Sequence, residues 1–83
     1  MENNKRIFVL NSLSVEEKSE LVHILKNDDG NFDIMRSNRI LVDGKSIMGV
    51  IHMDMSHKDA ELICYGAHEE TLKDIKKFVL MEN

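Results

Sequence analysis

The sequence predicts an α+β protein, a two-layer open-faced sandwich in which three helices cover one face of a four-stranded antiparallel sheet. Two observations carry this prediction. Some segments repeat apolar residues at helical spacing, whereas others are short runs of β-branched and aromatic residues typical of strands. These segments follow the order strand, helix, strand, strand, helix, strand, helix. The 83 residues are expected to form one domain, residues 1–83, because the chain is too short to bury a second core.

The first strand and the first helix are expected in the first third of the chain. Residues 5–11 (KRIFVLN) form an apolar run too short for a buried helix, which predicts a strand. Ser14 and Glu17 have the spacing of a capping box, so a helix should begin there. Residues 27–30 (NDDG) should end it. Its apolar stripe is made by Leu21, Ile24 and Leu25. Its other face is expected in solvent and carries Glu16, Glu17, Lys18, Glu20 and Lys26.

The middle of the chain is expected to form a hairpin followed by a short helix. Residues 32–36 and 39–43 have the pattern of two strands, and Asn38 between them suits a left-handed turn position. Ser46 is a natural N-cap for a short helix over Ile47–His52, whose apolar residues are three and four apart.

The last strand is expected over Ala60–Tyr65 and the last helix over residues 69–81. The strand contains Cys64, the single cysteine, which is interpreted as a small buried hydrophobe rather than a nucleophile. Four apolar residues should face inward from the last helix: Leu72, Ile75, Phe78 and Val79.

Composition narrows the classes of partner. Eleven basic and fifteen acidic residues give a net charge of −4, which disfavours binding to nucleic acid or to an anionic membrane. No apolar run reaches the roughly 18 to 20 residues of a membrane span, and the polar start has no signal region, so a cytoplasmic protein is expected. Protein or small-molecule partners are therefore favoured.

The segment 45–50 (KSIMGV) closely resembles the regulatory-serine motif of the HPr family, the small phosphocarriers of the bacterial sugar phosphotransferase system. The chain length, the order of elements and the place of the motif at the start of the second helix are similar as well. The resemblance covers nearly all 83 residues and implies that the predicted sandwich is HPr-like.

The sequence departs from the family at its phosphoryl-accepting histidine. An ungapped count from Ser46 places that histidine on Val15 and its accompanying arginine on Glu17. Valine has no ring nitrogen to accept phosphate, and glutamate repels the anion that the arginine would clamp. The chain is similar in this respect to Crh-type members, which also lack the histidine. We therefore expect no histidine phosphocarrier activity, and no catalytic constellation predicts an enzyme.

The resemblance assigns a regulatory role to Ser46. In the family, HPr kinase phosphorylates this serine, and the phosphoprotein acts with a transcriptional regulator in catabolite repression of sugar transport and metabolism. Phosphate at a helix start would meet free N–H groups, although Ser46 alone can also serve simply as the N-cap. The resemblance also implies a docking face for partner proteins, for which the expected residues are Lys45, Ile47, Met48 and Ile51.

A second interpretation remains open beside the first. His52, Asp54 and His57 place two imidazoles and a carboxylate close together in sequence, and these groups are transition-metal ligands. Their spacing matches no strong motif, so the main interpretation includes no metal and no cofactor. The alternative is an HPr-fold accessory protein that is not phosphorylated and binds a partner or a metal through these residues. The oligomeric state is left undetermined.

Overall fold

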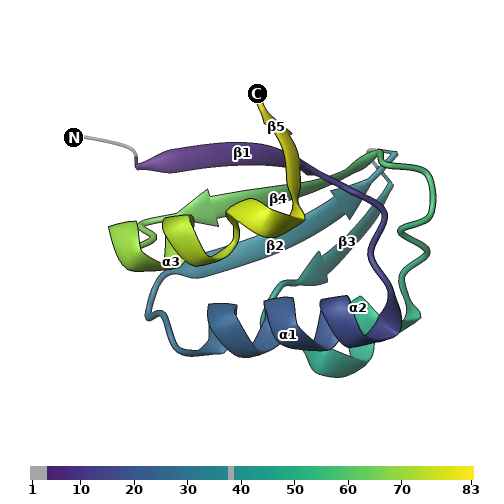
Figure 1. Cartoon of the computed structure of the whole chain (residues 1–83), viewed down its shortest axis with the longest axis horizontal. Helices are drawn as coiled ribbons and strands as arrows, with labels where there is room; N and C mark the ends of the chain where they lie inside the picture. The colour runs from purple at the N-terminus through teal and green to yellow at the C-terminus, as the bar shows by residue number, and fades with distance from the viewer. Residues whose placement is uncertain (1–3, 38) are drawn as a thin grey trace.

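The computed structural model describes residues 4–37 and 39–83, and within them five antiparallel strands form one sheet with three α-helices packed against it (Figure 1). The elements are β1 (Lys5–Leu10), α1 (Val15–Lys26), β2 (Asn31–Arg36), β3 (Ile40–Asp43), α2 (Ile47–His52), β4 (Ala60–Tyr65), α3 (Glu69–Asp74), a 3₁₀ turn (Lys76–Phe78) and β5 (Val79–Glu82). The strand order in the sheet is β3-β2-β4-β1-β5.

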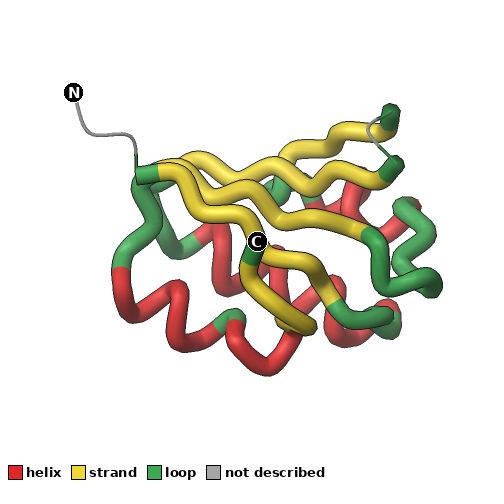
Figure 2. Tube along the Cα trace, turned by 90° about the horizontal axis from the view of Figure 1, so that it is seen from above, coloured by secondary structure: helices red, strands yellow, loops and turns green. Residues whose placement is uncertain are grey.

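The sheet has one covered face and one open face. Figure 2 shows the strands as a single layer with the helices gathered on one side. Alternate residues of the central strands point toward the helices, so Leu10, Ile34 and Leu62 are fully buried. The predicted α+β sandwich with helices on an antiparallel sheet is thus confirmed, although the sheet has five strands rather than four.

The predicted capping box at the start of α1 is present. The Ser14 hydroxyl accepts a hydrogen bond from the Glu17 backbone N–H at 3.1 Å, and the Glu17 carboxylate accepts one from the Ser14 N–H at 2.8 Å. This is the reciprocal capping box. In the β2–β3 hairpin, the described left-handed residue is Ser37, with φ 59°, whereas Asn38 lies outside the described residues.

The prediction of a last helix over residues 69–81 is wrong. Helix α3 ends at Asp74, a 3₁₀ turn follows, and residues Val79–Glu82 form β5 beside β1 (Figure 1). Ile75 and Phe78 are three residues apart, which suits the three residues per turn of a 3₁₀ helix, and both are buried. Strand β1 would otherwise leave its N–H and C=O groups unpaired along this edge, so pairing there outweighs the helical pattern.

Lys18 was expected in solvent and is instead buried, with 8% of its surface exposed. Its ammonium donates hydrogen bonds to the carbonyl oxygens of Met53 at 2.6 Å and Ile51 at 3.2 Å. Both carbonyls lie at the C-terminal end of α2, where a helix offers unpaired acceptors and a negative dipole end. Lys18 thereby fastens α1 to α2.

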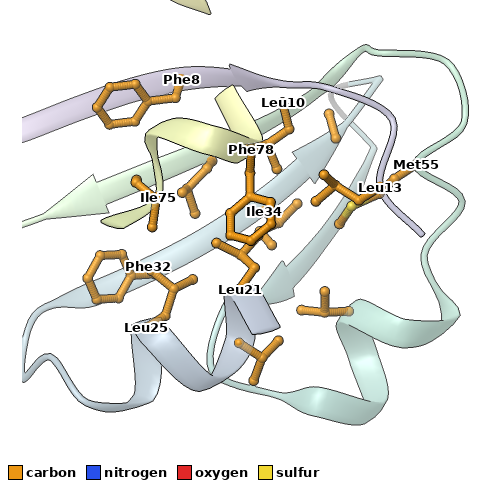
Figure 3. Packing of buried hydrophobic residues seen from close by; sticks show 14 of the residues in the cluster. Phe8, Leu10, Leu13, Leu21, Leu25, Phe32, Ile34, Met55, Ile75 and Phe78 are labelled. Carbon is orange, nitrogen blue, oxygen red and sulfur yellow. The ribbon is translucent and has the colours of Figure 1, made fainter. Parts of the chain in front are cut away.

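A single hydrophobic core lies between the sheet and the helices (Figure 3). Figure 3 shows Phe78 pointing from the 3₁₀ turn into this core, among residues of β2 and α1. The fully buried large side chains are Leu10, Leu21, Val22, Leu25, Phe32, Ile34, Val50, Leu62, Ile75 and Phe78. Val79, expected to face inward from a helix, packs against the same core from β5.

Candidate functional site

Ser46 occupies the N-cap of α2, as predicted. Its backbone is extended, with φ −93° and ψ 105°, and its hydroxyl accepts a hydrogen bond from the Gly49 N–H at 3.2 Å. A Cβ on Gly49 would lie 3.3 Å from the Ser46 Oγ, so the glycine lets the backbone approach the hydroxyl closely. Ser46 is half-buried, which leaves part of the residue in contact with solvent.

Helix α2 buries one residue and exposes two large apolar ones. Val50 is fully buried and anchors the helix, whereas Met48 is 65% exposed and Ile47 is 38% exposed. Ile51 is half-buried. A helix of six residues with a single buried anchor has a free side, and here that side is apolar. We call Ser46, Ile47, Met48 and Ile51 the α2 face.

Lys45 is engaged inside the fold. Its ammonium donates to the Asp28 carbonyl oxygen at 2.5 Å and lies 5.7 Å from the centre of the Phe32 ring. Its backbone N–H donates to the Asp43 carboxylate at 2.9 Å. The side chain therefore links the start of α2 to the turn after α1, and a contribution of Lys45 to partner binding stays a prediction.

Val15 and Glu17, which the resemblance assigns to the carrier positions, have side chains without that chemistry. Val15 is 58% exposed at the first turn of α1, so an apolar surface lies where the resemblance would place the histidine. Glu17 caps the Ser14 N–H through its carboxylate and contributes a negative charge to this turn. Neither residue offers a nitrogen to accept phosphate or a cation to hold it.

The residues of the alternative metal site do not form one cluster. The ring of His57 lies 3.5 Å from the Asp54 carboxylate, but the ligand atoms of His52, Asp54 and His57 do not all come within 4.8 Å of one another. The His52 Nδ1 is 2.9 Å from the Met48 carbonyl oxygen, within its own helix. Hydrogen bonds from the Ser56 hydroxyl and N–H lower the pKa of Asp54.

A different cluster, made by Asp28, Asp29 and His68, was missed in the sequence. Asp28 is buried and accepts hydrogen bonds from the N–H of Gly30 at 2.7 Å and of His68 at 2.9 Å. Burial raises the pKa of Asp28, but these bonds and one from the Thr71 side chain outweigh that effect and lower it. The Asp28 carboxylate thus joins the turn after α1 to the start of α3.

The rest of this cluster is exposed. The Asp29 carboxylate lies 2.9 Å from His68 Nε2 and raises the pKa of His68 through this hydrogen bond. The helix-stop pattern NDDG gave the only sequence signal, and it predicted a turn without indicating that the chain would return to it from the start of α3. Since both Asp28 oxygens are satisfied by protein donors, the cluster acts as a structural tie between two loops.

Cys64 lies on the covered face of β4 and is fully buried, as predicted. Burial raises the pKa of its thiol to about 12, so the reactive thiolate is scarcely present near neutral pH. This environment is that of a structural cysteine.

Comparison with known proteins gives one informative result. No family model matches the chain, and no curated protein matches it. Among solved structures, the chain is similar to HPr-C-His from Thermoanaerobacter tengcongensis, with a TM-score of 0.62 and 19% sequence identity. The similarity covers 93% of this chain and 92% of that chain. The chain has an HPr-like fold.

The HPr-like fold accounts for the placement of the candidate site, with α2 beside α1 on the covered face of the sheet. None of the helices in residues 4–37 and 39–83 is both long enough and apolar enough to cross a bilayer. Of the site residues predicted from the sequence, those of the α2 face lie together at one helix, where Ile47 and Met48 are exposed.

Proposed function

We propose that this HPr-like protein is a non-enzymatic regulatory protein related to the phosphotransferase system. It does not carry phosphate on a histidine. It acts through phosphorylation of Ser46 and through protein contacts of the α2 face. It works in the cytoplasm, where HPr kinase and a transcriptional regulator are the partners that the resemblance suggests.

The observation that carries this proposal is the exposure of Ile47 and Met48 directly after a capping serine. Their consecutive apolar side chains contribute nothing to the core cluster. Methionine is flexible and polarisable, so it adapts to partner surfaces of different shape. A phosphate on Ser46 would add about −1.5 to −2 charges beside this apolar surface and change which partners it accepts.

The side chains at the start of α1 support the proposal that this protein does not carry phosphate on a histidine. Val15 is exposed and apolar, and Glu17 repels an incoming phosphoryl group. The start of α1 thus offers partners an apolar contact but no side chain that could accept a phosphoryl group.

Two incubations test the proposal. In the first, the purified protein is mixed with HPr kinase and ATP, and in the second with phosphoenolpyruvate and the first enzyme of the phosphotransferase system. In both incubations, intact-mass spectrometry measures the number of phosphates added and peptide mapping identifies the modified residue. We expect one phosphate on Ser46 in the first and none in the second.

Ser46→Ala should abolish the modification, whereas Ser19→Ala, at an exposed serine of α1, should leave it unchanged. Met48→Ser should raise the KM of the kinase for this protein, with Leu80→Ser on β5 as the matched exposed control. A phosphohistidine formed from phosphoenolpyruvate would refute the proposal. An unmodified Ser46 would refute its regulatory part and favour an accessory protein that is not phosphorylated.

A further inference from the structure

The open face of the sheet carries apolar residues from all five strands, with the carboxylate of Glu61 on β4 between Met35 and Val9. The strand register places Ile7 opposite Ile63, Met35 opposite Leu41, and Val9 opposite Met81. These six residues, which we call the open-face stripe, point away from the helices because they alternate with the buried residues of their strands. The stripe includes a residue from each of the five strands.

The burial of Ile63 shows that this stripe packs as a layer of its own. Ile63 is only 7% exposed, yet it is absent from the core cluster between sheet and helices. Its neighbours on the open face therefore cover it. At the two edges of the sheet, Leu41 is 59% exposed and Met81 is 54% exposed, so the stripe ends in apolar surface that contacts water.

Besides Glu61, which accepts a hydrogen bond from the Asn83 side chain, two carboxylates lie next to the stripe without a cation to balance them. Asp33 on β2 and Asp43 on β3 are directly opposite one another, an arrangement in which like charges repel and destabilise the sheet. Neither takes part in the ion pairs of the described residues, and Asp43 accepts only the Lys45 backbone N–H. Lys5, on the same face, lies on β1 with its ammonium 5.9 Å from the Tyr65 ring.

We propose that the open face is a docking site for a cationic amphipathic segment of a partner protein. Apolar side chains of that segment cover the open-face stripe, and its Lys or Arg residues pair with Asp33 and Asp43. The stripe spans about 19 Å between the outer strands, from four strand spacings of about 4.8 Å, which equals roughly 13 residues of helix.

The charge pattern selects this occupant over others. A second copy of the chain, with its net charge of −4, would bring further negative charge to the face. A cationic segment relieves the repulsion between Asp33 and Asp43 when it binds. The site lies on the face of the sheet opposite the helices, so it is separate from the α2 face and does not depend on phosphorylation of Ser46.

The probe is a synthetic amphipathic helix of about 14 residues with Leu on one face and Lys along its borders. The matched probe has Glu in place of every Lys. Each is titrated into the ¹⁵N-labelled protein at physiological salt, and the amide shifts of each residue give the site and the affinity. We expect the Lys probe to shift amides of all five strands and the Glu probe to shift none.

The double variant D33N/D43N should bind the Lys probe about three- to tenfold more weakly. The double variant E16Q/E70Q changes the net charge equally on the helix side and should bind as the unmodified protein does. Leu41→Ser should weaken binding, whereas Val15→Ser, an equally exposed apolar site on α1, should not.

Shifts confined to the helices would overturn the proposal, as would equal binding by the two double variants. Sedimentation of the free protein provides a further test, because a dimer that D33N/D43N strengthens would assign the open face to self-association instead.

Discussion

Replacing Lys18 by Met tests whether the buried ammonium fastens α1 to α2. The substitution keeps most of the side-chain volume, so the expected loss comes from the two hydrogen bonds to the carbonyl oxygens of Met53 and Ile51. A hydrogen bond from a charged donor contributes about 1.5–3 kcal/mol, and the 2.6 Å bond to Met53 should account for most of that. The longer bond and the favourable position at a helix C-terminus add a smaller amount.

We therefore expect Lys18→Met to lower the free energy of unfolding by about 2–4 kcal/mol. The matched control is Lys26→Met, which removes an equal charge from an exposed position of the same helix and should cost less than about 1 kcal/mol. Urea unfolding followed by far-ultraviolet circular dichroism measures both. For a domain of this size, the difference corresponds to a fall of several degrees in Tm per kcal/mol.

Hydrogen exchange provides a second measurement on the same variant. Loss of the Lys18 contacts should raise exchange at the amides of α2 more than at those of β1 and β4, because it loosens one helix locally. Equal stability losses in the Lys18 and Lys26 variants, or unchanged exchange in α2, would show that the buried ammonium gives no net stabilisation.

Three further outcomes follow from individual groups. Ser46→Ala should cost about 0.5–2 kcal/mol of stability through loss of the cap, as measured by urea unfolding. The folded pKa of Asp28 is lowered, so its contribution to stability is present above the unfolded pKa of about 3.9 and is lost as pH falls through the folded value. Urea unfolding should therefore show that acidification from about pH 5 to about pH 3 lowers the stability of Asp28→Asn less than that of the unmodified protein. Cys64 should resist alkylation at about pH 8 in the native protein and react fully in denaturant; equal rates would contradict its burial.

Local patterns in the sequence were sufficient for most of the elements. The capping box at Ser14 and the serine at position 46 predicted the starts of α1 and α2, because capping depends only on residues three apart. Met48 is exposed because a short helix cannot bury every side, and its role in partner contact stays a prediction. Whether partners bind there depends also on the surfaces of those partners, about which this sequence carries no information.

The errors arose where distant contacts outweighed local pattern. Val79 continues the helical spacing set by Leu72 and Ile75, and the free edge of β1 makes a strand the better solution for residues 79–82. Lys18 has the pattern of a solvent-facing lysine, and its burial depends on carbonyl groups more than 30 residues away. The link from Asp28 to the start of α3 is similar, because a local turn pattern carries no information about which loop will meet it.

The pairing of β1 bears on how the protein is made. Strand β1 is made before the other described elements, yet both strands that flank it, β4 and β5, come from the last third of the given sequence. During synthesis, the apolar run IFVL therefore has no sheet partner until the C-terminal residues emerge, and such unpaired segments are prone to aggregate. Lys5 and Arg6 directly precede that run, where adjacent charges keep nascent chains apart. After release, the Arg6 guanidinium pairs with the Glu82 carboxylate at 2.6 Å, so the residue that protects the nascent strand also joins it to the last strand.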